Sequence, residues 1–203
     1  MMKRNTCAVI ITSALIGVLV GLARAGDEFN RPGPYVGLGA AGGLSQFGGT
    51  LQNFGDSAGF NARGGYRFND YLAIEGLYEY MDEFGSSQKF SSGTKVTTHF
   101  QTNNFSLMSK VILPTLGITR LQLYVSGGIG FLNANATGKF QGRGLKLTGD
   151  ASETQFAGRV DGGIDYFLTH EVSTFFDLGY VIPTENLSHM EYLSLSLGMK
   201  YNF

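Results

Sequence analysis

The stretch Leu193-Ser-Leu-Ser-Leu-Gly-Met-Lys-Tyr-Asn-Phe203, at the end of the chain, decides the fold. Its odd-numbered positions are all apolar or aromatic, and its even-numbered positions are all small or polar. Because successive side chains of a strand point to opposite faces, this pattern predicts a β-strand with one apolar and one polar face. Its length matches the roughly 9–11 residues that a tilted strand needs to cross a bilayer.

Seven earlier segments repeat the alternation, so we predict eight strands in all. The other segments are 36–44, 58–68, 72–80, 105–113, 121–131, 156–168 and 172–182. Short turns such as Asn69-Asp70 and Thr169-His170 alternate with longer connections at 45–57, 82–102, 133–155 and 183–191. This arrangement is typical of membrane barrels. The predicted fold is therefore all-β: an eight-stranded antiparallel up-and-down transmembrane β-barrel.

A soluble β-sandwich or a lipocalin-like barrel would show the same alternation with the two faces inverted. The polar face here carries glycines and charges of both signs, not the broad Lys and Glu coverage of a soluble surface. The apolar face carries large residues and almost no charge. These features favour the membrane barrel.

The beginning of the chain has the pattern of an export signal. Two basic residues precede an apolar run at 8–22, and Ala23-Arg24-Ala25 matches an A-x-A cleavage site. We expect a cleaved signal peptide at 1–25 and one barrel domain at 26–203; an uncleaved membrane helix is the rival interpretation. The single cysteine, Cys7, would leave with the signal, which excludes disulfides.

Charged residues on the polar faces balance, five positive against five negative. An eight-stranded barrel is just wide enough inside for its side chains, and buried charges need partners. We predict an internal salt-bridge network, with Arg63 or Arg67 facing Glu75 and Glu79 across the first hairpin. The ten residues are Arg63, Arg67, Glu75, Glu79, Lys110, Arg159, Asp161, Asp165, Asp177 and Lys200.

The lumen has two interpretations. A plugged structural core is favoured; a narrow polar channel, as in a small porin, is the alternative. The channel would use the room left by inward glycines, namely Gly59, Gly65, Gly128, Gly130, Gly163 and Gly179.

Catalytic chemistry has little support. His99 stands beside threonines, and Ser188-His189 precedes Glu191, but neighbours on an extended strand face opposite ways and cannot form a triad. The three histidines lack metal-ligand spacing. We expect no catalytic site, cofactor or metal, and no enzyme activity; a lipid A-modifying enzyme is the least favoured alternative.

The long connections are the expected interaction surface. The connection at 133–155 carries a basic group, Lys139, Arg143 and Lys146, that could contact anionic lipopolysaccharide or an anionic host surface. The connections at 82–102 and 133–155 both contain strand-forming residues. The strands could therefore continue above the membrane as hairpins whose edges recruit partner strands.

Two motifs carry a family resemblance. The first strand opens with Gly33-Pro-Tyr-Val-Gly-Leu-Gly39, and the chain ends on Tyr201-Asn-Phe203. With the signal and the eight strands, the chain resembles the small outer-membrane barrels: the OmpA membrane domain, OmpX and the opacity-type surface antigens. The resemblance implies that Leu197, Met199, Tyr201 and Phe203 form a C-terminal insertion signal.

The resemblance also implies the location and partners. We expect an outer-membrane protein of a Gram-negative bacterium with extracellular loops, periplasmic termini and no periplasmic peptidoglycan-binding domain. Its expected partners are outer-membrane lipid, lipopolysaccharide, the barrel-assembly machinery, periplasmic chaperones and host surface molecules, but no nucleic acid. The implied role is structural, adhesive or antigenic.

Overall fold

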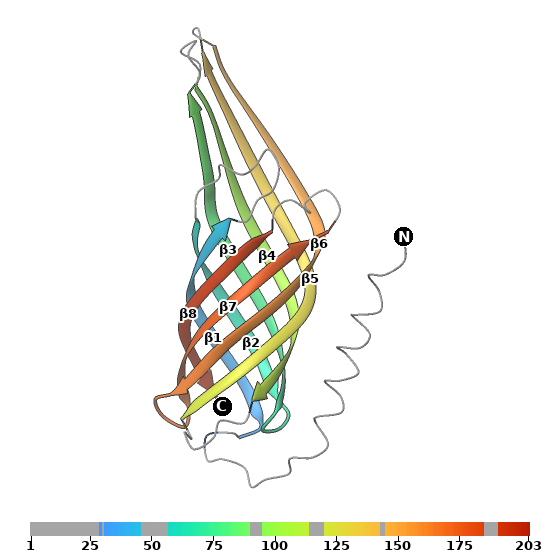
Figure 1. Cartoon of the computed structure of the whole chain (residues 1–203), viewed down its shortest axis with the longest axis vertical. Helices are drawn as coiled ribbons and strands as arrows, with labels where there is room; N and C mark the ends of the chain where they lie inside the picture. Colours follow the sequence, from blue (N-terminus) through green and yellow to red (C-terminus); the bar gives the residue numbers. More distant parts are fainter. Residues whose placement is uncertain are drawn as a thin grey trace.

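The chain forms a closed barrel of eight antiparallel strands, as predicted. The computed structural model describes residues 29, 31–45, 57–89, 95–113, 120–142, 145–184 and 191–203. Each strand pairs with its neighbours in sequence, and β1 also pairs with β8, which closes the barrel (Figure 1). The strands are β1 (Gly33–Ser45), β2 (Ser57–Arg67), β3 (Leu72–Lys89), β4 (Lys95–Leu113), β5 (Leu121–Gly142), β6 (Leu145–Phe167), β7 (Val172–Pro183) and β8 (Tyr192–Asn202).

Large apolar side chains point out of the barrel, and polar side chains point in. Leu38, Phe105 and Leu197 are 69%, 63% and 60% exposed, whereas the inward Glu79 is fully buried. This confirms the predicted orientation of the two faces. A soluble barrel would place these apolar side chains inside, so the inverted interpretation is wrong.

At one end of the barrel, short turns connect the strands. We call this end the turn end. The Asn69 side chain accepts hydrogen bonds from the backbone N–H groups of Tyr71 and Leu72, both at 2.9 Å. The Thr169 hydroxyl oxygen accepts one from the backbone N–H of Val172 at 3.0 Å. Local side-chain acceptors of this kind stabilise tight turns, which explains why these short polar pairs connect strands.

At the opposite end, strands β3 to β6 continue beyond their neighbours as a four-stranded sheet, which we call the extension (Figure 1). The connections predicted at 82–102 and 133–155 are therefore largely strand, and the hairpin alternative for them is correct. A bulge shifts the β3–β4 register between Met81 and Phe84. Along the extension, among the residues that the structure describes, β3 pairs only with β4 and β6 pairs only with β5, so the outer edges of β3 and β6 have no strand partner within those ranges.

An aromatic row crosses the outward face of the four long strands. Tyr78, Phe105, Phe131 and Phe156 are opposite one another in successive strand pairs. The Tyr78 and Phe105 ring centroids are 5.1 Å apart, and those of Phe131 and Phe156 are 5.2 Å apart. Aromatic girdles mark the interfaces of membrane barrels, so this row marks the edge of the apolar band.

A cluster of buried apolar side chains fills the barrel where the extension begins. Phe100, half-buried, packs against this cluster. Its members are Ala41, Met81, Leu132, Ala134, Ala157, Val181 and Tyr192. Apolar residues at inward positions were not expected there, because the predicted strands ended before most of them.

The predicted signal peptide, with Ala23 and Ala25, lies outside the described residues. In the parts of the chain that the structure describes, no helix has the length and apolar character needed to span a membrane.

Candidate functional site

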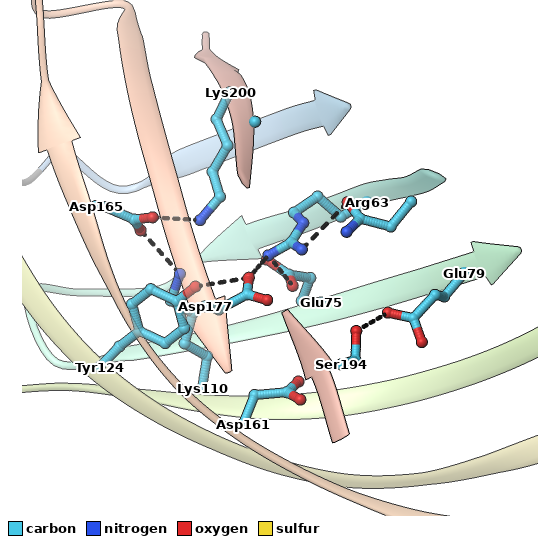
Figure 2. Close-up of polar contacts among 12 residues, drawn as sticks. Arg63, Glu75, Glu79, Lys110, Tyr124, Asp161, Asp165, Asp177, Ser194 and Lys200 are labelled. Carbon is cyan, nitrogen blue, oxygen red and sulfur yellow. Dashed lines mark hydrogen bonds and ion pairs between the residues drawn. The ribbon is translucent and has the colours of Figure 1, made fainter. Parts of the chain in front are cut away.

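The lumen holds two groups of charged side chains, and Figure 2 shows the first group together with Glu79, Ser194 and Asp161 of the second. In the first, nearer the turn end, Asp165 accepts hydrogen bonds from Lys110 at 2.9 Å and from Lys200 at 2.6 Å. These residues come from β4, β6 and β8, so one carboxylate links three strands. Lys110 Nζ also lies 3.4 Å from the centroid of the Tyr124 ring, a cation–π distance.

Arg63 extends this first group across the barrel. Its guanidinium donates to Asp177 at 2.6 Å and lies 3.6 Å from a Glu75 oxygen. The hydroxyl of Tyr124 donates to the same Asp177 carboxylate at 3.1 Å, and that of Tyr35 donates to Glu75 at 2.8 Å. The buried carboxylates therefore receive both cationic and neutral donors, which is the condition for keeping charge inside a protein.

The second group is centred on Arg159, which is fully buried on β6. Its guanidinium lies 2.9 Å from a Glu79 oxygen, and its Nε donates to Asp161 at 2.8 Å. Glu79 also accepts hydrogen bonds from the hydroxyls of Tyr192 at 3.0 Å and Ser194 at 2.6 Å. The apolar cluster, of which Tyr192 is a member, lies between this group and the extension.

All ten charged residues predicted to face inward are buried in the lumen. The predicted pairing across the first hairpin is only partly right: Arg63 reaches Glu75, but Glu79 pairs with Arg159 from β6. Arg67 instead donates to the side chain of Gln122 at 2.6 Å. The pairing differs from the prediction because an inward side chain can contact side chains of strands on the far side of the lumen as well as those of adjacent strands.

The inward glycines do not leave open space, contrary to the basis of the channel alternative. A Cβ atom on Gly65 would lie 2.5 Å from the Tyr35 hydroxyl, and one on Gly163 would lie 2.6 Å from the Tyr124 hydroxyl. Cβ atoms at Gly59, Gly128, Gly130 and Gly179 would also meet neighbouring atoms within 2.1 Å. Gly65, Gly163 and Gly179 thus leave room for inward side chains of other strands, whereas Gly59, Gly128 and Gly130 lie close against the backbone of an adjacent strand.

A small cavity remains between the first charged group and the turn end. Its volume is about 10 Å³, and Arg67, Lys110, Asp165 and Lys200 contribute to its walls. That is space for about one water molecule.

The turn-end mouth holds a residue from before the first strand. The Phe29 ring stacks on His170 with a centroid distance of 4.7 Å and lies 5.7 Å from the ring of Phe167. The Arg120 guanidinium lies 5.5 Å from the Phe29 ring centroid. A cavity of about 150 Å³ adjoins Phe29, so this mouth is partly filled.

Two of the three predicted surface cations have their backbones near the tip of the extension. Arg143 lies outside the described residues, whereas the backbones of Lys139 and Lys146 lie on β5 and β6. The register places Lys89 opposite Lys95, Lys95 opposite Gln141, and Gln141 opposite Lys146. Sequence reasoning missed Lys89 and Lys95 because their place in this row depends on strands continuing through a predicted loop.

Of the catalytic candidates, the structure describes His99 and Glu191 but not Ser188 or His189. His99 lies on β4 within the extension, and the hydroxyl of Tyr180 donates to Glu191. Within the described ranges, no group of three or more His, Cys, Asp or Glu side chains could hold a metal ion.

The residues of the predicted insertion signal face outward on β8. Leu197, Met199, Tyr201 and Phe203 are all exposed. The rings of Tyr201 and Phe203 pack edge to face with their centroids 5.0 Å apart.

The family profile of the outer membrane protein beta-barrel domain matches residues 11–203. The chain belongs to this family. The outer-membrane location and the barrel fold expected from the sequence are therefore confirmed. No match is found among curated protein sequences.

Solved structures show the same barrel. The attachment invasion locus protein Ail of Yersinia pestis shares 17% identity, covers 85% of this chain and 99% of its own, and has a TM-score of 0.57. Neisserial surface protein A shares 20% identity over 84% of this chain and 97% of its own, with a TM-score of 0.56. OprG of Pseudomonas aeruginosa shares 12% identity over 87% of this chain and 98% of its own, with a TM-score of 0.55. At these identities the likeness concerns the fold.

Proposed function

We propose that this outer-membrane barrel is a non-enzymatic surface-recognition protein: the barrel anchors it, and the extension contacts partners outside the cell. The observation that carries the proposal is the continuation of β3 to β6 beyond the barrel, as a sheet that extends past the last residues paired with β2 and β7. Residues 135–142 of β5 alone would reach roughly 25 Å beyond the apolar cluster, at about 3.3 Å per residue. In this proposal the termini and short turns lie in the periplasm.

The chemistry of the tip favours an anionic partner. Lys89, Lys95 and Lys146 share one row of the register, and Lys139 lies two positions from that row. Clustered cations of this kind attract sulfate and phosphate groups and steer polyanions toward a surface. Ail, which has the same fold, was crystallised with the heparin analogue sucrose octasulfate. We infer that sulfated or otherwise anionic host glycans are the partner class.

Heparin binding tests this proposal. The refolded protein should bind immobilised heparin in a salt-sensitive way, and the variant K89Q/K95Q should bind roughly three- to tenfold more weakly, since each exposed ion pair contributes up to about 1 kcal/mol. The control R31Q/R120Q removes the same charge from exposed residues at the turn end and should bind like the original. Equal binding by all three proteins would contradict the proposal.

The channel alternative is tested on the same sample. Because the lumen is occupied by contacting charged pairs and an apolar cluster, we expect no steady conductance in planar bilayers. Conductance that persists in K89Q/K95Q would favour the small porin. A lipid mass change in cells that produce the protein would favour an enzyme.

A further inference from the structure

A second surface lies on the outward face of the extension, between the aromatic row and the basic tip, the part of the extension that carries Lys89, Lys95 and Lys146. It consists of amide and hydroxyl side chains in two rows on β4, β5 and β6. Asn103, Asn133 and Thr154 are opposite one another in the first row, and Gln101, Asn135 and Ser152 are opposite one another in the second. We call these six residues the polar grid; all are exposed or half-buried.

Hydrogen bonds within the polar grid orient its side chains. The Asn133 amide donates to the Thr154 hydroxyl at 2.8 Å and to the Ser152 hydroxyl at 3.3 Å. The Asn135 amide donates to the Asn133 oxygen at 2.9 Å. Because the two hydroxyl oxygens accept these bonds, their own hydrogens remain available to an outside acceptor. A surface ordered in this way loses less entropy when it binds.

The position of the polar grid indicates what it faces. Its rows follow the aromatic row by two and four residues along each strand. At about 3.3 Å per residue, the rows lie within roughly 15 Å of the aromatic row. Since the aromatic row marks the edge of the apolar band, the grid lies in the layer just outside it. In the outer leaflet this layer contains the sugars of lipopolysaccharide.

The absence of charge in the polar grid indicates the chemistry of its partner. None of the six side chains is ionisable, whereas proteins hold phosphate mainly with Arg and Lys. A sugar hydroxyl both donates and accepts hydrogen bonds, and so do amide and hydroxyl side chains. We propose that the polar grid binds the hydroxyl-rich core sugars of the lipopolysaccharide around the barrel. This inference rests on the proposed placement of the extension outside the cell, but the contact is separate from the lysines at the tip.

The experiment compares vesicles that differ only in the sugar. The refolded full chain is reconstituted with lipopolysaccharide bearing a complete core oligosaccharide, or with lipopolysaccharide truncated after its innermost acidic sugars. The thermal midpoint is followed by gel mobility, because a folded barrel and an unfolded chain migrate differently. We expect a higher midpoint in the complete-core vesicles, and we expect N133A/N135A to lose most of that gain.

The matched control is Q155A. Gln155 is half-buried on β6 and lies opposite the buried Leu132, which places it in an inward register position; its amide donates to Glu153. The control also removes an amide from the same sheet, but it should keep the gain. Comparing two vesicle types for each variant cancels any general loss of stability.

Three results would overturn the proposal. The first is an equal midpoint of the original protein in the two vesicle types, which would place the contact on phosphates or acidic sugars. The second is an undiminished gain in N133A/N135A. The third is equally tight binding of a free neutral oligosaccharide in detergent, which would make the polar grid a site for outside glycans.

Discussion

Replacing Arg159 with methionine should destabilise the barrel more than any exposed charge change. The substitution keeps much of the side-chain volume but leaves Glu79 and Asp161 buried without their cation. Removing one partner of a buried ion pair costs about 3–5 kcal/mol. Glu79 keeps its hydrogen bonds from Tyr192 and Ser194, whereas Arg159 supplies the contacts that Asp161 makes. We therefore expect a loss of about 4 kcal/mol, most of it from Asp161.

The assay is reversible urea unfolding from lipid vesicles, followed by tyrosine fluorescence and gel mobility. In the Arg159→Met background, a second change Asp161→Asn should restore more stability than Glu79→Gln, because only the first neutralises the carboxylate that lost its donors. The exposed Arg31→Met change is the control and should have little effect. A loss below about 1 kcal/mol for Arg159→Met, the level of an exposed pair, would refute the reasoning, as would the opposite order of rescue.

Three further outcomes are expected. Gly39→Val should cost about 1–3 kcal/mol in urea unfolding, because its Cβ would lie 2.7 Å from Phe175 Cζ, whereas Gly64→Ala, whose Cβ has no neighbour nearer than 4.0 Å, should cost less. Val125→Arg, on the exposed outward face, should cost about 2–4 kcal/mol in vesicles and Val125→Ala much less; equal costs would contradict a lipid-facing wall. Phe203→Ala should reduce assembly in cells while in vitro refolding is unchanged, and Phe203→Tyr should assemble normally; normal assembly of the alanine variant would contradict the insertion-signal hypothesis.

The sequence predicts the faces of the strands well within the wall of the barrel, because the side chains there alternate with a period of two. Lys110 and Asp165 are examples: alternation places each on the polar face, and the structure buries both. It does not predict which charges meet. Arg159 and Glu79 are separated by 80 positions in the chain, and their contact depends on how the strands are staggered around the barrel.

The ends of the strands are also predicted poorly from the sequence. Met81, Leu132 and Val181 occupy inward positions but are apolar, so they look like a break in the polar face. They instead close the barrel beyond the charged groups. The bulge between Met81 and Phe84 adds to the difficulty, because it shifts the register in which the later part of β3 pairs with β4.

The unbroken course of β3 to β6 has a mechanical consequence. These strands run from the turn end through the wall of the barrel into the extension, with continuous pairing between β4, β5 and β6 (Figure 1). A pull on the tip therefore acts along the strands and loads many backbone hydrogen bonds at the same time, in shear. A hinged loop would let the bonds open one after another under much smaller forces. For the surface-recognition role proposed above, this geometry would let the protein hold a partner against drag while the membrane bears the load.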